Sequence, residues 1–189
     1  MSSETKHDPV TGSDDTRMLG PTPTPLGIAV MTVSDTRTLA TDTSGALLVE
    51  RLQAAGHTLA ARVILPDDGP RVAATVLAWC DDPSVMAIVI TGGTGLTGRD
   101  VTVDALERLY DKAIPGFGEL FRMLSYAEIG ASTIQSRSSA GLVRQRLVFC
   151  LPGSTNACRL AWDAILRHQL DVRSKPCNLV ALMPRFGEV

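Results

Sequence analysis

The sequence predicts one α/β domain, with a three-layer α/β/α arrangement around a mostly parallel sheet. Short apolar runs alternate along the chain with longer amphipathic stretches. A helix between successive strands implies right-handed crossovers and parallel pairing. Apolar residues make up 44% of the chain but aromatic residues only 4%, so the expected core is aliphatic, as suits strands buried on both faces.

A length of 189 residues fits one large domain better than two small ones. We expect this domain to cover residues 26–189. Residues 1–25 are polar and have no apolar period, which predicts a disordered N-terminal arm. Three prolines at the end of this arm leave open a second interpretation, in which it is an extended tether on a neighbouring subunit.

The first half of the domain reads as three strands separated by two helices. Strands are expected at residues 26–34, 59–65 and 85–90. The third run is continuously apolar, which favours a central strand. Residues 42–44 (Asp-Thr-Ser) offer N-cap side chains for the first helix, and Gly56 is placed to end it. The second helix carries apolar residues from Val72 to Cys80.

The second half is expected to hold a helix that Thr102 can cap, another helix at residues 118–128, and a long helix after Ser154. Residues 141–145 and 147–151 read as paired or successive strands. A short strand is possible at residues 178–182.

Charge and composition exclude several classes of function. The formal net charge is −2 without a block of like charges, so neither a nucleic-acid binder nor a basic membrane-surface helix is expected. The longest apolar run is too short to span a bilayer, and the N-terminus lacks the pattern of a signal peptide. The four cysteines lack metal-ligand spacing, which favours reduced thiols and a cytoplasmic protein.

The glycine-rich segment from Thr91 to Asp100 is the strongest functional signal. It follows the expected central strand, and ligands of α/β sheets bind at the carboxyl ends of the strands. Glycines let the backbone approach a ligand, and successive amide N–H groups can cradle a phosphate. A flexible turn is the alternative interpretation. The segment is neither a Walker loop nor a dinucleotide fingerprint.

Two carboxylates lie at this expected edge of the sheet. Asp100 beside an anion site would repel the ligand unless a cation lay between them, which points to magnesium. Capping of the following helix is the alternative for Asp100. Asp67 follows the second strand, where an ordinary turn is the alternative.

Further polar residues follow other strands. Ser34 and Asp35 come after the first strand, and residues 152–154 (Pro-Gly-Ser) precede the last long helix, whose N-terminus favours anions. The pair Ser136 and Arg137 can offer a guanidinium to a phosphate. Each is ambiguous alone, because an arginine is often solvated and Gly-Ser often just starts a helix. His57 and His168 are expected at the surface rather than in catalysis.

Together these segments resemble the MoaB/MogA family of molybdenum-cofactor biosynthesis proteins, and its MoaB branch in particular. The resemblance runs from about residue 26 to residue 178. It rests on the loop Thr91–Gly95 with Asp100 and on ordered matches at residues 33–35, 42–45, 66–67, 115–119, 121–125, 136–137 and 152–155.

The resemblance implies a molybdopterin-binding fold that forms homotrimers or hexamers. Active members transfer AMP from Mg-ATP to the terminal phosphate of molybdopterin and release pyrophosphate. Asp67 and Asp100 match the acidic positions tied to catalysis and magnesium. Ligand binding is implied for Ser34, Asp35, Thr91, Gly92, Gly93, Thr94, Gly95, Leu96, Ser136, Arg137, Pro152, Gly153 and Ser154.

Two other functions stay open at this point. One is a non-catalytic oligomer that binds molybdopterin for storage, delivery or assembly with other cofactor-synthesis proteins. The other is a nucleotide-binding domain without affinity for pterins. Apolar residues on more than one side of residues 117–126 favour an oligomer, with a wholly buried helix as the alternative.

Overall fold

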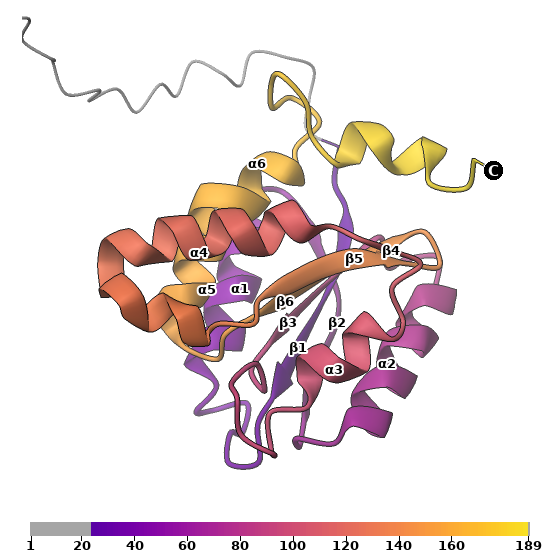
Figure 1. The fold of residues 1–189 in the computed structure, drawn as a ribbon. Coiled ribbons are helices and arrows are strands. Elements are labelled where there is room, and N and C mark those ends of the chain that lie inside the picture. The colour runs from indigo at the N-terminus through magenta and orange to yellow at the C-terminus, as the bar shows by residue number, and fades with distance from the viewer. Residues whose placement is uncertain (1–23, 189) are drawn as a thin grey trace, which may run out of the picture.

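The protein is described here by a computed structural model that covers residues 24–188 (Figure 1). The expected disordered arm, residues 1–25, lies almost wholly outside these residues and stays a prediction. The described residues form one mixed sheet with helices on both faces. This arrangement confirms the three-layer α/β fold expected from the sequence.

The sheet has the strand order β2-β1-β3-β6-β5-β4. Its strands are β1 (Gly27–Val33), β2 (Thr58–Leu65), β3 (Ala87–Thr91), β4 (Lys112–Ala113), β5 (Ser139–Val143) and β6 (Arg146–Leu151). The first three strands and β6 run parallel, whereas β5 is antiparallel to β6 and β4 is antiparallel to β5. The carboxyl ends of β1, β3 and β6 therefore meet at one edge, where the glycine-rich loop begins.

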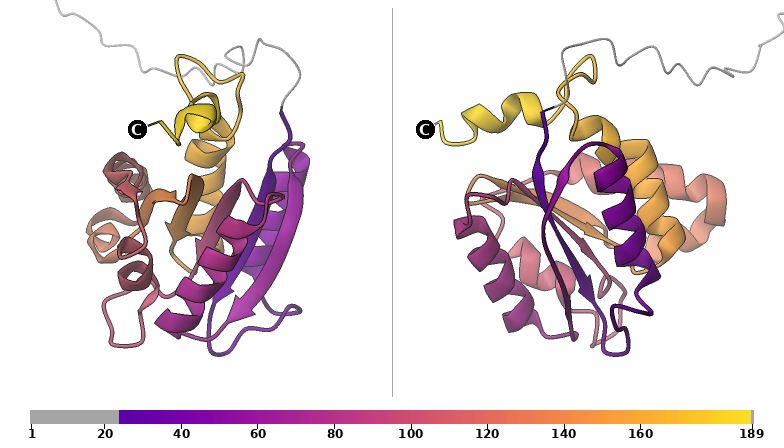
Figure 2. Two further views of the ribbon diagram at one scale, coloured as in Figure 1. Left: turned by 90° about the vertical axis from the view of Figure 1, so that its right-hand side faces the viewer. Right: turned by 180° about the vertical axis from the view of Figure 1, so that it is seen from behind.

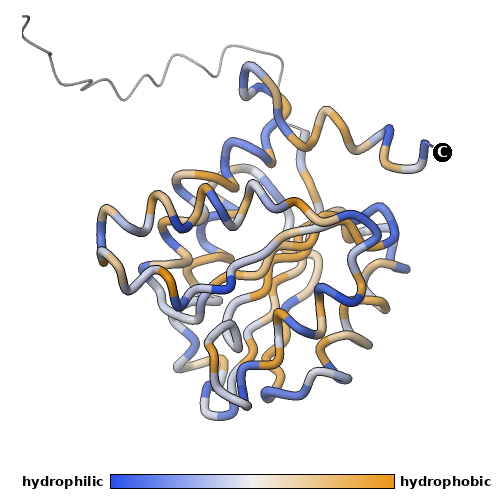
Figure 3. Tube along the Cα trace, viewed as in Figure 1, coloured by the Kyte–Doolittle hydropathy of each residue, from blue (hydrophilic) through white to orange (hydrophobic). Residues whose placement is uncertain are grey.

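The helices divide between the two faces of the sheet (Figure 2). One face is covered by α1 (Thr43–Ala54), α4 (Pro115–Ile129) and α5 (Thr155–Ala161), and the other by α2 (Gly69–Asp81) and α3 (Thr102–Glu107). Successive residues of β3 belong to opposite cores, since Val89 packs with α1 and α5 while Ile90 packs with α2 and α3. Figure 3 shows the apolar residues gathered along these central strands. A strand buried on both faces must be continuously apolar, as the sequence of β3 is.

Side chains cap the N-termini of helices at three places. Asp42 accepts from the Gly45 amide at 2.8 Å, Asp68 from the Arg71 amide at 3.0 Å, and Ser154 from the Ala157 amide at 3.2 Å. These bonds fix the starts of α1, α2 and α5, because the first amides of a helix have no partner within it.

The expected long helix after Ser154 is present: α5 continues into a π-helical turn, η3 (Trp162–Leu166), and then α6 (Arg167–Gln169). Three expectations about local structure were wrong. Residues 178–182 do not form a strand; a 3₁₀ helix, η4, spans Val180–Arg185. Thr102 does not cap α3 but lies in its first turn. His57 is buried, with 7% of its surface exposed, and its Nδ1 accepts from the Leu26 amide.

A second 3₁₀ segment, η2 (Gly130–Gln135), connects α4 to β5. No helix within residues 24–188 is long and apolar enough to cross a bilayer.

Candidate functional site

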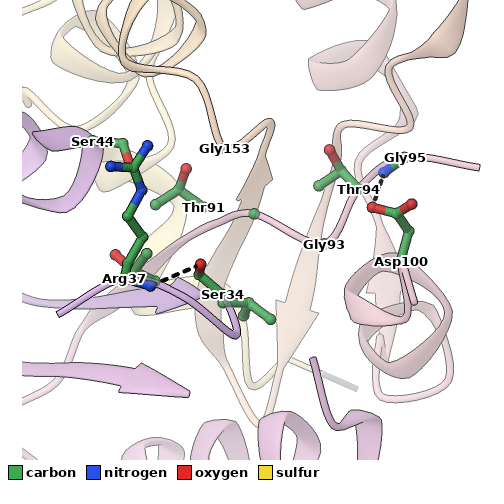
Figure 4. A pocket seen from close by; sticks show the side chains of 12 residues that line it. Ser34, Arg37, Ser44, Thr91, Gly93, Thr94, Gly95, Asp100 and Gly153 are labelled. Carbon is green, nitrogen blue, oxygen red and sulfur yellow. Dashed lines mark hydrogen bonds between the residues drawn. The ribbon is translucent and has the colours of Figure 1, made fainter. Parts of the chain in front are cut away.

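A polar cavity of about 300 Å³ lies at the carboxyl ends of β1 and β3. It gathers several residues singled out from the sequence, namely Ser34, Thr91, Gly92, Gly93, Thr94, Gly95, Asp100 and Gly153. Figure 4 shows Thr94, Gly95 and Asp100 on one side of the cavity and Arg37, Ser44 and Thr91 on the other. The topology thus brings together residues that are far apart in the sequence.

The glycines of the loop are required by its backbone. Gly92 and Gly93 have φ angles of 102° and 62°, in the region that side chains disfavour. A Cβ atom on Gly92 would lie 2.1 Å from the Val33 carbonyl oxygen. The backbone of the loop therefore runs directly against the end of β1, where only glycine fits.

Asp100 closes the loop onto itself. One carboxylate oxygen accepts from the Gly95 amide at 2.9 Å, and the other accepts from the Thr97 amide at 2.9 Å and the Thr97 hydroxyl at 2.6 Å. The hydrogen bond from the Thr97 hydroxyl is the main cause that lowers the pKa of Asp100. Its side chain does not cap α3, because the cap position is Val101. The helix-cap interpretation is therefore wrong.

Arg137 holds the same loop from outside. Its Nε donates to the Gly95 carbonyl at 2.8 Å, and its Nη2 donates to the Asp100 carbonyl at 2.7 Å. Its Nη1 pairs with the Asp104 carboxylate at 3.0 Å. The guanidinium thus contacts the backbone of the loop instead of lining the cavity. Its neighbour Ser136 contacts the Ser138 hydroxyl at 3.0 Å.

Asp67 is in the opposite situation to Asp100. Burial raises its pKa, and the negative charges of Asp35 and Asp100 raise it further against the opposing effect of Arg99. Its Oδ1 lies against the bare Cα of Gly93, since a Cβ atom there would lie 2.9 Å from it. A carboxylate held close to like charges is a site that a cation would stabilise.

Asp35 and Arg99 join two loops at the rim of the cavity. The Arg99 guanidinium forms an ion pair with Asp35, which is the main cause that lowers the pKa of that carboxyl. Asp35 also accepts from the Asp67 amide at 3.1 Å. It therefore positions the turn that carries Asp67 and is not a member of the cavity wall.

The remaining residues expected at the site have separate places. Leu96 is exposed at the tip of the loop, with 70% of its surface accessible. The Pro152 carbonyl accepts from the Thr91 hydroxyl at 2.9 Å, and Ser154 caps α5. These contacts fix the wall of the cavity around Gly153, next to the N-terminus of α1, where the Thr43 and Thr155 hydroxyls lie 2.9 Å apart.

Sequence reasoning missed Thr32, Arg37 and Ser44 as lining residues. The hydroxyls of Thr32 and Ser44 both donate to the buried carboxylate of Asp42, at 2.9 Å and 3.3 Å. Burial opposes ionisation of Asp42, yet its bonds with Arg62, Gly45 and Thr32 lower its pKa. The N-cap signal at Asp42 was visible in the sequence, but its contact with β1 was not, because that contact depends on the tertiary fold.

No group of three or more His, Cys, Asp or Glu side chains within residues 24–188 could enclose a metal ion. Asp67 and Asp100 are two carboxylates beside the glycine-rich loop, and protein sites commonly hold magnesium with one or two carboxylates together with substrate phosphates and water.

The chain is similar to known proteins over most of the described domain. Residues 29–172 match the family described as "Probable molybdopterin binding domain". Molybdenum cofactor biosynthesis protein B of Escherichia coli K12 is 47% identical over 154 residues, which cover 82% of this chain and 91% of that protein. The Bacillus subtilis protein of the same name is 46% identical over 142 residues, 75% of this chain and 84% of the relative.

A solved structure extends this similarity to the fold. A crystal structure of molybdenum cofactor biosynthesis protein B superposes with a TM-score of 0.77 and 44% identity, covering 79% of this chain and 94% of that one. The motifs, the fold and these relatives agree on one conclusion. The chain belongs to the MoaB/MogA family of molybdenum cofactor biosynthesis proteins, within its MoaB branch.

Proposed function

We propose that this protein transfers AMP from Mg-ATP to the terminal phosphate of molybdopterin and releases pyrophosphate. The new bond joins the molybdopterin phosphate to the α-phosphorus of ATP, and the bond between the α- and β-phosphates breaks. Nucleotidyl transfer of this kind depends on positioning and charge neutralisation more than on covalent catalysis by the protein. A site for it must hold phosphates firmly and neutralise their charge.

The observation that carries this proposal is the pairing of a polar cavity of about 300 Å³ with an internally fixed glycine loop. Thr94 provides a hydroxyl group along the cavity wall, while the Thr91 and Ser44 hydroxyls, on the same wall, donate to the Pro152 carbonyl and to Asp42. Asp100 and Arg137 hold the loop in shape before any ligand arrives. A preorganised site loses less conformational entropy on binding, so it favours the aligned geometry that transfer requires.

Magnesium is part of the proposal. Asp67 would hold the ion together with ligand phosphates, and Asp100 would lie close enough to add its charge. The ion would neutralise the phosphate chain and polarise the phosphorus under attack. Asp67 supports this role because its pKa is raised by burial and by neighbouring carboxylates, a repulsion that a divalent cation relieves.

We also propose a homotrimer or a hexamer of two trimers. Helix α4 supports this, because Phe117 and Phe121 are buried in the core while Met123 and Tyr126 are 65% and 63% exposed. The helix is therefore apolar on an outward face as well, and such faces commonly mark interfaces. Light scattering measures the mass of the protein in solution. A stable monomer at micromolar concentration would contradict both the proposed oligomer and an interface on α4.

The activity is tested by incubating the purified protein with molybdopterin, ATP and magnesium. Expected results are release of pyrophosphate and formation of adenylylated molybdopterin, both lost when EDTA removes the metal. Tight binding of molybdopterin without pyrophosphate release would favour the alternative, a non-catalytic oligomer for storage or delivery. Binding of ATP without any affinity for molybdopterin would contradict both.

A further inference from the structure

A buried hydroxyl group behind the glycine-rich loop has no hydrogen-bond partner. The Thr102 side chain is completely buried, and its Oγ1 is unpaired within residues 24–188. A threonine in a helix can donate to the carbonyl four residues before it, but Thr102 lies in the first turn of α3, and this bond is not formed. Because most buried polar groups in folded proteins are paired, an unpaired one needs a physical explanation.

The backbone holds Thr102 against the glycine-rich loop. Its amide donates to the Gly93 carbonyl at 3.1 Å, which ties the start of α3 to the loop. Gly93 has a φ angle of 62°, and a Cβ atom on it would overlap with Thr102 Oγ1. The hydroxyl therefore lies directly against the bare Cα of Gly93, where any larger residue would displace it.

The Asp67 carboxylate lies against the same glycine and also lacks a partner. A Cβ atom on Gly93 would be 2.9 Å from Asp67 Oδ1. The Asp67 amide donates to Asp35 at 3.1 Å, but the carboxylate oxygens accept no hydrogen bond from residues 24–188. A hydroxyl without an acceptor and a carboxylate without a donor are thus brought to one position.

The two segments that carry these groups are packed together. Helix α2 begins just after Asp67, and α2 and α3 lie side by side on one face of the sheet (Figure 1). A Cβ atom on Gly69 would lie 3.7 Å from the Ala105 Cβ, an ordinary van der Waals distance. The fold therefore sets the backbone spacing between Asp67 and Thr102.

A metal ion at Asp67 would give this hydroxyl a role. A carboxylate that binds an ion through one oxygen keeps lone pairs on the other, and metal-binding carboxylates are commonly held by an outer hydrogen bond. Such a bond selects one orientation of the carboxylate and raises the affinity for the metal. Thr102 is completely buried and does not line the cavity, so it can act on a ligand only through another residue.

We propose that Thr102 is a positioning residue for Asp67. Its hydroxyl donates to the Asp67 carboxylate when that carboxylate binds magnesium, and so fixes the orientation of the metal ligand. Rotation about side-chain bonds is enough to form the hydrogen bond, because both groups already lie against Gly93. This inference rests on the proposed function, since it concerns the metal site of that reaction.

The test removes the hydroxyl while the shape of the side chain is kept. In the full-length protein, electron paramagnetic resonance measures the affinity for Mn²⁺ in the presence of pyrophosphate. Thr102→Val should weaken this affinity about tenfold, the effect expected when an outer partner of a metal ligand is lost, and Thr102→Ser should preserve it. Thr75→Val is the matched control, since the Thr75 hydroxyl donates to the Arg71 carbonyl within α2, and it should bind Mn²⁺ like the wild type.

Stability distinguishes positioning from a purely structural role. Because the wild-type hydroxyl is unpaired, the urea midpoint of Thr102→Val should equal or exceed that of the wild type. Thr102→Ser loses a buried methyl group, so its midpoint should fall. The two variants should therefore affect metal affinity and stability in opposite ways, which a purely structural threonine would not produce.

The magnesium dependence of AMP transfer gives a third measurement. Thr102→Val should need about tenfold more magnesium for half-maximal pyrophosphate release, with little change in turnover at saturating magnesium. Wild-type Mn²⁺ affinity in Thr102→Val, or a loss of affinity with a matching loss of stability, would overturn the inference alone. If the wild-type protein itself does not bind Mn²⁺ with pyrophosphate, the metal site of the proposed function is contradicted, and this inference with it.

Discussion

Asp67 and Asp100 lie on two sides of the same glycine-rich loop but in opposite electrostatic situations. Asp100 accepts hydrogen bonds from the Gly95 amide and from the amide and hydroxyl of Thr97, and its pKa is lowered. Asp67 is partly buried beside like charges, and its pKa is raised. The Asp100 carboxylate therefore stabilises the loop. The Asp67 carboxylate is repelled by its acidic neighbours, and a cation would relieve this repulsion. Two acidic residues that look equivalent in the sequence thus have different tasks.

The largest effect is expected from Asp67→Asn. This variant keeps the size of the side chain but removes the charge that magnesium needs, so AMP transfer should fall at least about 100-fold. The melting temperature should not fall, because the variant removes repulsion from Asp35 and Asp100. Pyrophosphate release over a range of magnesium concentrations measures the effect. Unchanged turnover at saturating magnesium would remove Asp67 from the mechanism.

Asp100→Asn should have a mixed effect. The amide cannot accept from all three donors, so the loop loses order and AMP transfer falls about ten- to a hundredfold. In contrast to the Asp67 variant, stability should also fall, by about 1–2 kcal/mol, because charge-assisted hydrogen bonds are lost at a partly exposed site. Urea denaturation checks this difference. If Asp100→Asn is as stable as the wild type, the carboxylate does not hold the loop.

Arg137→Ala should weaken ligand binding although the Arg137 side chain does not line the cavity. The loss of its bonds to the Gly95 and Asp100 carbonyls frees the loop, and we expect about tenfold weaker affinity for magnesium pyrophosphate. Arg137→Lys should not restore affinity, because an ammonium cannot reproduce the planar set of donors. Arg185→Ala, whose wild-type side chain pairs with Glu188 near the C-terminus, is the control. Rescue by lysine would mean that only the charge at position 137 matters.

The smallest expected effect is on the pH dependence of the free energy of unfolding. The contributions of Asp67 and Asp100 to this dependence should have opposite signs. A lowered pKa means that Asp100 stabilises the fold above its ordinary pKa of about 3.8 and loses this contribution as the pH falls below it. A raised pKa means that the contribution of Asp67 is complete below that value and is lost as the pH rises through its folded-state pKa.

At neutral pH, Asp100→Asn should therefore be less stable than the wild type, and Asp67→Asn equal or more stable. Both differences should shrink at acidic pH, as followed by thermal unfolding between about pH 3 and pH 7. If the stability of both variants changed with pH in the same way, the two carboxylates would have the same electrostatic environment, which would contradict this account.

The fold could be predicted from the sequence because its signals are local. The apolar run of β3, the caps at Asp42 and Ser154 and the glycines of the loop each act through neighbouring residues. The wrong predictions concern residues whose structure is determined by contacts with residues distant in the sequence. His57 is buried because α1 and β2 bring it against Trp162, at a ring distance of 6.4 Å. The sequence around residues 178–182 is apolar enough for a strand, yet residues 180–185 form the 3₁₀ helix η4, which contains Pro184, a residue without the N–H group that a strand ladder needs.

The candidate site could be predicted in part for the same reason. The glycine loop and its aspartate form one continuous motif, so the sequence shows them together. The task of Arg137 could not be inferred, because its contacts with Gly95 and Asp100 span about forty residues of chain and depend on the position of β5. Arg37 was missed because its guanidinium, which donates to the Thr41 carbonyl at 2.9 Å, lies beside the cavity only in the folded chain.

The most direct test of the account is the affinity for Mn²⁺, a spectroscopic substitute for magnesium, in the presence of pyrophosphate. Electron paramagnetic resonance can measure it for the wild type, Asp67→Asn and Asp82→Asn, where Asp82 is an aspartate at the far end of α2. We predict about tenfold or greater weakening for Asp67→Asn and none for Asp82→Asn. Equal Mn²⁺ affinity for all three proteins would contradict a metal site at Asp67 and the division of tasks between the two carboxylates.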